Sequence, residues 1–400
     1  MTDRSIEASK ASTPSSSGQE FSEFDPLIDK FVATHPKRGP GEIVHIKGNS
    51  TDAWKQIVSS SADDAYRLVM RTAHRALRSE KSDSIRWLYM GLAKALIRPE
   101  IRLSDCDVQE LLLWHRMEMD RWVKEIDSHP GDEWIQYRNF HRKLWEDWSF
   151  FRPLLEWLEQ CSKRSGLTST MRQALTDFPD ANITNYELSR TWTLLGRKLP
   201  SLHATDVWTC RALGELKKMP ERQADSWFAL LAHCGTASSG KPTAKWLKTA
   251  TQLIADLGEA EFRPRLVSWL PLTGQPRQTA IAEHNSWFDL DLDEFNSDVL
   301  KGLVWCLGLL QSPEILNALT DLATISYRKI PIKGPRAPKI GNAALWALGY
   351  LPGHDGAGAL AILRRRIKSA NVQKLIDAAL TQVAEREGMH SDDVEELSRP

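Results

Sequence analysis

An internal repeat is the feature of this 400-residue chain that most limits its possible folds. The motif Trp-x-Leu-Gly-x-Leu begins at Trp305 and begins again 41 positions later, at Trp346. The dipeptide Leu-Gly ends four apolar segments, with its glycine at Gly214, Gly258, Gly308 and Gly349. Each of these glycines is expected to end a helix, because glycine adopts positive φ at little cost. A period of about 40–47 residues with two helices is typical of HEAT and armadillo repeats, which stack to bury their apolar faces.

Helical periodicity also covers most of the chain before the repeat. Between Ser61 and Ser79 apolar residues recur at spacings of three and four, which places them on one helix face. Further helices are predicted at 85–97, 107–125, 132–149, 151–164, 168–177, 185–198, 205–217 and 222–234. Strand-like alternation is confined to 42–47 and, more weakly, 329–333.

The predicted fold is therefore all-α. We expect a HEAT/armadillo-like α-solenoid of stacked helix pairs, with an irregular N-terminal helical region. The predicted pairs are 242–257 with 259–270, 297–310 with 313–326, and 339–351 with 355–368, followed by a final helix at 371–387. If Trp305 and Trp346 fill the seams between pairs, replacing either with alanine should cost about 3–5 kcal/mol.

Composition shifts divide the chain into three parts. Residues 1–20 are rich in serine and nearly free of large apolar groups, which predicts a disordered tail. Residues 21–235 form the predicted N-terminal helical region, and 243–400 the C-terminal repeats. The sequence GTASSGKP at 235–242 is the predicted linker between them.

Charge and cysteine content exclude several classes of protein. Lys+Arg and Asp+Glu both total 52, so the whole chain carries no net attraction to nucleic acid or to anionic lipid. No apolar run approaches the roughly 18 residues of a membrane span, and the N-terminus lacks a secretory signal. The five cysteines include no CxxC pair. These features predict a cytoplasmic protein with reduced cysteines, no metal and no cofactor.

A proline-stiffened basic loop is the leading candidate for a binding site. Its cations are Arg328, Lys329, Lys333, Arg336 and Lys339, and no acidic residue occurs between 322 and 354. Such a loop suits a phosphate, a nucleic-acid backbone or an acidic protein segment. The alternative is a connecting loop whose charges serve solubility. The triplet Arg364–Arg366 is read as a polar helix face near a C-terminus, where cations are favoured.

The chain also holds an acidic counterpart to this loop. Alternating carboxylates at Asp289, Asp291 and Asp293, with Glu294 and Asp298, could bind calcium, but the glycine and the bidentate glutamate of an EF-hand are missing. We therefore expect these residues to cap the helix that begins near Asn296, or to lie opposite the basic loop.

Catalytic motifs are not found in the sequence. GxSxG, Walker A, HExxH and a strand-linked GxGxxG are all missing. His115 lies among apolar residues and is predicted to be a core or edge residue rather than a ligand. Helical-repeat DNA glycosylases combine tryptophans with a catalytic aspartate, but helical spacing separates the candidates here: Trp134, Arg142, Trp145, Asp147, Trp148 and Trp157.

Residues 295–398 resemble a family of bacterial proteins related to the molybdate metabolism regulator. The segments that carry the likeness are the Gly-Pro-Arg-x-Pro-Lys loop at 334–339, Gly341-Asn342 and the run at 384–388. The resemblance implies a bacterial cytoplasmic protein with a regulatory or scaffolding role, and a domain of unknown function with no established reaction.

These observations favour a non-catalytic scaffold that binds a protein or peptide partner along its concave face. Trp305, Gly308, Trp346 and Gly349 would form the repeat core, and the basic loop would form a rim. The alternative is a nucleic-acid-associated module that uses the basic loop. A glycosylase-type enzyme is the third hypothesis. No membrane partner is expected, and the sequence leaves the oligomeric state open.

Overall fold

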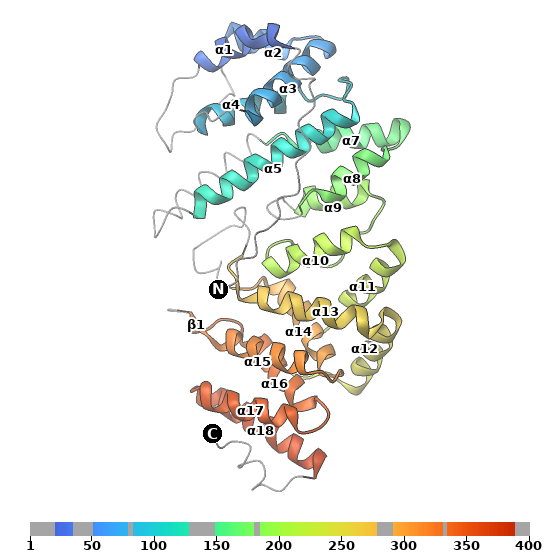
Figure 1. Ribbon diagram of the computed structural model, residues 1–400, viewed down its shortest axis with the longest axis vertical. Helices are drawn as coiled ribbons and strands as arrows, with labels where there is room; N and C mark the ends of the chain where they lie inside the picture. The colour runs from blue at the N-terminus through green and yellow to red at the C-terminus, as the bar shows by residue number, and fades with distance from the viewer. Residues whose placement is uncertain are drawn as a thin grey trace. The chain divides into compact units, whose positions relative to one another are not determined.

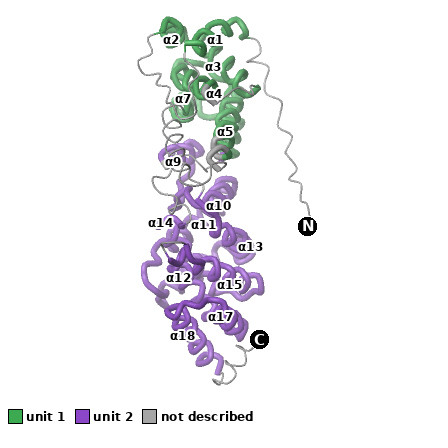
Figure 2. Tube along the Cα trace, turned by 90° about the vertical axis from the view of Figure 1, so that its left-hand side faces the viewer, with its two compact units in different colours: residues 1–178 green, residues 179–400 purple. Residues whose placement is uncertain are grey.

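The computed structural model describes residues 21–34, 51–78, 83–127, 149–179, 185–277, 291–330 and 334–388. Helices account for almost all of the regular structure in these ranges, which confirms the predicted all-α fold (Figure 1). Two compact units divide the chain, residues 1–178 and residues 179–400 (Figure 2). The predicted tail at 1–20, the strand-like segment at 42–47 and nearly all of the helix predicted at 132–149 lie outside the described residues.

Unit 1 is a set of helices that pack around α3 and α5. Its elements are η2 (Ser22–Phe24), α1 (Asp25–Ala33), α2 (Asp52–Val58), α3 (Ala62–Leu77), α4 (Asp83–Leu96), α5 (Asp105–Asp127), α7 (Phe151–Ser165) and α8 (Ser169–Asp177). Helix α3 contacts α4 and α5, and α5 contacts α8. Side-chain caps explain where several helices begin. Ser61 accepts the backbone N–H of Asp64, and Thr168 accepts that of Met171.

Two contacts in unit 1 join segments that are distant in sequence. Arg71 donates two hydrogen bonds to Asp25, from Nε at 2.8 Å and from Nη2 at 2.6 Å, and Arg75 adds a third at 3.1 Å. The hydrogen bond from Arg71 is the largest influence on the Asp25 carboxyl and lowers its pKa. These ion pairs hold α1 against α3. Elsewhere in the unit, His115 on α5 lies in an aromatic cluster, with its ring centroid 4.8 Å from that of Phe151.

Unit 2 contains the predicted repeat. Its elements are α9 (Asn185–Leu194), α10 (Val207–Lys218), α11 (Glu221–Cys234), α12 (Ala244–Leu257), α13 (Glu259–Trp269), η3 (Leu270–Gly274), α14 (Glu294–Leu307), α15 (Pro313–Tyr327), β1 (Lys329–Ile330), β2 (Gly334–Pro335), α16 (Pro338–Tyr350), α17 (Asp355–Arg366) and α18 (Ala370–Glu387). From α12 to α18 these bounds agree with the predicted helices to within about three residues.

The helices of unit 2 form two series of neighbours. In one series α11 contacts α14, α14 contacts α16, and α16 contacts α18. In the other series α13 contacts α15, and α15 contacts α17. Helices α14 and α15 thus correspond to α16 and α17, as the 41-residue offset predicts. The assignment of this arrangement to a HEAT-like solenoid stays a prediction.

Two of the repeat glycines do not end a helix through positive φ, contrary to the prediction from the sequence. Gly308 follows α14 with φ −61°, an ordinary helical value, and Gly349 lies within α16. A Cβ on Gly308 would lie 3.1 Å from the Cα of Ala347, and a Cβ on Gly349 would lie 3.2 Å from the Cβ of Ala379. These two glycines therefore serve close packing between neighbouring helices rather than positive φ. Among the four glycines assigned to the repeat, Gly258 has positive φ, 92° at the end of α12.

The boundary between the units also differs from the predicted one. It lies after residue 178, whereas the predicted linker at 235–242 lies inside unit 2. Helix α11 precedes that linker and packs tightly on α14 beyond it. A Cβ on Gly302 of α14 would lie 2.5 Å from the Cα of Cys234 on α11. The segment at 235–242 is therefore a loop between packed helices, and Ser239 in it accepts a hydrogen bond from Lys301.

Candidate functional site

The basic loop between α15 and α16 forms a small hairpin in the structure. Lys329 pairs with Pro335 and Ile330 with Gly334 in an antiparallel register, so the weak strand signal at 329–333 corresponds to β1. Gly334 has φ 101°, a conformation that favours glycine. Backbone hydrogen bonds close the base of the loop, from Arg336 to the carbonyl of Arg328 at 2.9 Å and from Ala337 to that of Ser326 at 2.9 Å.

The predicted cations of this loop do not share one exposed surface. Arg336 is buried, and its guanidinium donates to the carbonyls of Thr273 and Gln275, the latter at 2.9 Å. Lys339 forms an ion pair with Asp298 at 2.7 Å. Arg328 and Lys329 are exposed, and Lys333 lies outside the described residues. The prediction of a rim built from all five cations is therefore wrong for Arg336, because its buried side chain holds the loop against η3.

The acidic segment caps the start of α14, which is one of the two roles predicted for it. The carboxylate of Asp293 accepts the backbone N–H groups of Phe295 at 3.0 Å and Asn296 at 3.2 Å. Asp298 lies opposite the basic loop through its pair with Lys339. Among the residues that the structure describes, no group of three or more His, Cys, Asp or Glu side chains is placed to hold a metal ion. Asp289 lies outside these residues.

Asp206, at the start of α10, joins this acidic segment in a buried polar network. It accepts hydrogen bonds from the Asn296 side chain at 2.8 Å and from the backbone N–H of Asp293 at 3.1 Å. Arg277 lies 3.6 Å from the same carboxylate. Burial raises the pKa of Asp206, the largest effect on this group, while these donors oppose the shift. The network is structural, since it connects the starts of α10 and α14.

The repeat tryptophans belong to a longer row of rings, which we call the aromatic column. Ring centroids lie 4.5 Å apart between His233 and Trp246, 5.2 Å between Trp246 and Trp305, 6.2 Å between Trp305 and Trp346, and 4.7 Å between Trp346 and Tyr350. The column crosses α11, α12, α14 and α16. The structure thus brings Trp305 and Trp346 together, as the repeat predicts.

Exposure varies along the aromatic column. Trp305 at its centre is fully buried, whereas Trp246 and Trp346 are half-buried and Tyr350 is 40% exposed. The indole N–H of Trp246 donates to Thr236 at 3.0 Å. The indole N–H of Trp346 has no acceptor among the described residues. Rings on both sides of Trp305 are therefore partly exposed, while Trp305 itself lies in a packing seam.

A buried lysine lies beside the column. The Nζ of Lys301 on α14 lies 5.2 Å from the centroid of the Trp305 ring and donates to the carbonyl of Ser239 at 3.0 Å. Burial is the largest influence on the ammonium and lowers its pKa, whereas the nearby Asp298 opposes the change. Lys301, Trp246 and Tyr350 are not among the site residues predicted from the sequence. Lys301 and Tyr350 could have been found from their spacing of four residues from the two repeat tryptophans, whereas Trp246 has no counterpart in the motif.

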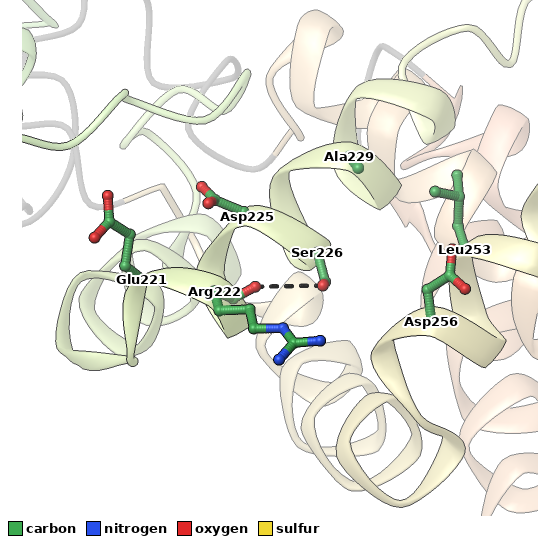
Figure 3. Close-up of a pocket in the computed structure, with 7 residues that line it drawn as sticks. All are labelled: Glu221, Arg222, Asp225, Ser226, Ala229, Leu253 and Asp256. Carbon is green, nitrogen blue, oxygen red and sulfur yellow. Dashed lines mark hydrogen bonds between the residues drawn. The ribbon is translucent and has the colours of Figure 1, made fainter.

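An open depression of about 520 Å³ lies between α11 and α12 (Figure 3). Figure 3 shows the side chains that line it, Glu221, Arg222, Asp225, Ser226, Ala229, Leu253 and Asp256. Its three carboxylates come from exposed residues, and the hydroxyl of Ser226 donates to the carbonyl of Arg222 within its own helix. These contacts are typical of a solvated helix surface, and we assign the depression no function.

The residues considered for a glycosylase-type enzyme do not form a site in the described structure. Trp157 is buried and donates its indole N–H to the carbonyl of Ile101 at 2.9 Å, so it is a core residue. Trp134, Arg142, Trp145, Asp147 and Trp148 lie outside the described residues. His115 is fully buried and its Nε2 is 3.0 Å from the hydroxyl of Ser149, which confirms its prediction as a core residue.

Comparisons with known proteins add no family or fold assignment: no family model, no curated protein and no solved structure matches the chain. The resemblance of residues 295–398 to regulator-like bacterial proteins therefore stays a prediction. Within the described residues, no helix is both long and apolar enough to span a membrane.

Proposed function

We propose that unit 2 is a non-catalytic scaffold that binds a segment of a protein partner across α12, α14 and α16, at the partly exposed rings of the aromatic column. The observation that carries this proposal is the row formed by Trp246, Trp346 and Tyr350, which are partly exposed around a buried Trp305. Tryptophan and tyrosine are the residues that most often dominate the energy of protein interfaces, since each buries a large area at low entropic cost.

Packing beneath the column makes it a rigid surface. Gly302 brings α14 close to α11, and Gly308 brings it close to α16. Stacked neighbours therefore limit the motion of the rings before any partner binds. A surface that is already ordered loses less entropy on binding, so a given contact area yields a higher affinity. The indole N–H of Trp346 also offers a hydrogen-bond donor to a partner carbonyl.

Charge near the column favours a protein segment over nucleic acid. Nucleic-acid affinity depends mainly on cations that neutralise phosphates. Lys301 is buried against Ser239, Lys339 is paired with Asp298, and Arg336 is buried under the basic loop. Of the five loop cations on which the nucleic-acid hypothesis depends, Arg336 is thus buried and Lys339 is paired. A scaffolding role would also agree with the regulatory role that the resemblance at 295–398 implies.

Selection of displayed 12-residue peptides on the full chain tests the proposal. Enriched peptides would be synthesised and titrated by calorimetry against the parent protein, Trp346→Ala and Tyr350→Ala. We expect each substitution to weaken binding about tenfold, which is about 1.4 kcal/mol. Tyr186→Ala is the matched control, because Tyr186 is an exposed tyrosine on α9 outside the column.

Two results would contradict the proposal. One is that no enriched peptide depends on Trp346 or Tyr350 while the control behaves like the parent. The other is that single-stranded oligonucleotides bind the column more tightly than any peptide, with an affinity that falls steeply with salt and with the same substitutions. That second outcome would support the nucleic-acid alternative instead.

A further inference from the structure

The turn between α17 and α18 carries a concentration of positive charge that the proposed scaffold surface does not use. Its exposed cations, which we call the basic end, are Arg365, Arg366, Lys368 and Lys374. The sequence alone suggests a polar helix face for the arginine triplet, because cations are favoured in the last turn of a helix. That explanation covers Arg365 and Arg366, which lie in the last turn of α17. It does not cover Lys368 in the connection or Lys374 in the first turns of α18.

Contacts across the turn hold the end of α17 and the start of α18 against each other. Arg364 on α17 pairs with Asp377 on α18 at 2.8 Å. Gln373 donates to the carbonyls of Arg364 at 3.5 Å and Ile367 at 3.2 Å. The end of α17 and the start of α18 are thus held together, so Lys374 lies next to the residue that bonds the last turn of α17.

The charge at this turn is not balanced by its surroundings. Asp377 neutralises Arg364, and no carboxylate among the described residues pairs with the four cations of the basic end. Four positive charges at one turn repel each other, and this repulsion is relieved when an anionic ligand binds. The local excess contrasts with the whole chain, whose net charge is zero.

We propose that the basic end binds an acidic segment of a protein partner, as a second interface separate from the aromatic column. The large apolar side chains exposed on α17 and α18 are Ile362 and Leu375, both aliphatic. Aliphatic side chains pack against the apolar residues of a peptide, whereas sequence-tolerant binding of single-stranded nucleic acid relies on aromatic stacking. An acidic segment that also carries leucine or valine therefore matches this surface better than a nucleic acid does.

A charge-reversal experiment tests the inference on the full chain. The probe is a fluorescein-labelled 12-residue peptide of glutamate and leucine, followed by fluorescence anisotropy in 50 mM salt. We expect binding by the parent protein, at least a tenfold loss of affinity in Arg365→Glu plus Lys368→Glu, and a further loss as salt rises to 500 mM. The same peptide with glutamine in place of glutamate should not bind.

The matched control reverses an equivalent pair of charges in unit 1. Lys163→Glu plus Arg164→Glu changes two exposed cations in the last turn of α7, so it has the same effect on net charge and also acts at a helix end. We expect this variant to bind like the parent. Circular dichroism melting of both variants separates a loss of binding from a loss of folding.

Either of two outcomes would overturn the inference. One is that the acidic peptide fails to bind at 50 mM salt, and the other is that the control loses as much affinity as the basic-end variant. A labelled 12-nucleotide single strand that binds more tightly than the peptide, through the same two cations, would make this a nucleic-acid surface instead. Tyr350→Ala leaves peptide binding at the basic end unchanged, so failure here is distinguishable from failure of the aromatic column.

Discussion

In unit 2 one kind of contact recurs, with Gly308 against Ala347 and then Gly349 against Ala379, whereas unit 1 is held by contacts that each occur once. The ion pairs of Asp25 with Arg71 and Arg75 and the aromatic cluster around His115 have no second copy among the described residues. A repeated contact leaves a periodic sequence signature, but a unique contact does not. The difference explains why unit 2 was predictable in detail and unit 1 was predictable as little more than helices.

The largest expected effect separates the two repeat tryptophans. Trp305→Ala removes a fully buried ring and should lower the free energy of unfolding by about 3–5 kcal/mol. Trp346 occupies the same repeat position but is half-buried, so Trp346→Ala should cost about half as much. Denaturant unfolding of both variants checks this order. Equal losses would show that the two positions are equivalent in energy as well as in sequence.

The next effect concerns the close packing that distinguishes unit 2. Gly302→Ala places a Cβ 2.5 Å from the backbone of Cys234 and should destabilise the protein by about 3 kcal/mol, the upper end of the range for overpacking. Gly214→Ala is the control, because its Cβ would meet no atom within 4 Å inside α10, and it should stabilise by about 0.5–1 kcal/mol. Thermal melting measures both changes. If Gly302→Ala left the melting temperature unchanged, α11 and α14 could move apart at little cost.

A smaller effect, dependent on pH, belongs to unit 1. Burial lowers the pKa of His115 to about 3, below its usual value near 6.5. As the pH falls, His115 therefore binds a proton in the unfolded chain before it does so in the folded protein. The stability of the fold relative to the unfolded chain is not reduced by this effect above about pH 6.5, and it decreases progressively toward pH 3. At pH 5 this loss is about 2 kcal/mol.

His115→Phe tests this linkage, because phenylalanine keeps a ring among Phe150, Phe151 and Phe178 but cannot bind a proton. We expect the free energy of unfolding of the variant to change less between pH 7 and pH 5 than that of the parent protein. Hydrogen exchange should place the difference in the helices of unit 1. Parallel pH profiles for the two proteins would show that His115 has the same pKa in the folded and unfolded states, which would contradict the prediction.

The candidate sites were predictable to different degrees. The offset from Trp305 to Trp346 was enough to place both residues in one seam, because stacked repeats bring equivalent positions together. The basic loop was located correctly, but the burial of Arg336 was not predictable, since its acceptors on Thr273 and Gln275 lie more than 60 positions earlier. The basic end was visible as an arginine triplet, but its extension to Lys374 depends on how α18 folds back on α17.

Local patterns in the sequence determined the helices, their caps and the tandem order of unit 2, because helix periodicity and capping involve residues only a few positions apart. The tertiary structure alone decided which cations are buried, which rings of the aromatic column stay open, and that Gly308 and Gly349 serve helix contact rather than a turn. These properties depend on neighbours supplied by distant segments, and side-chain exposure is defined only once those segments have packed.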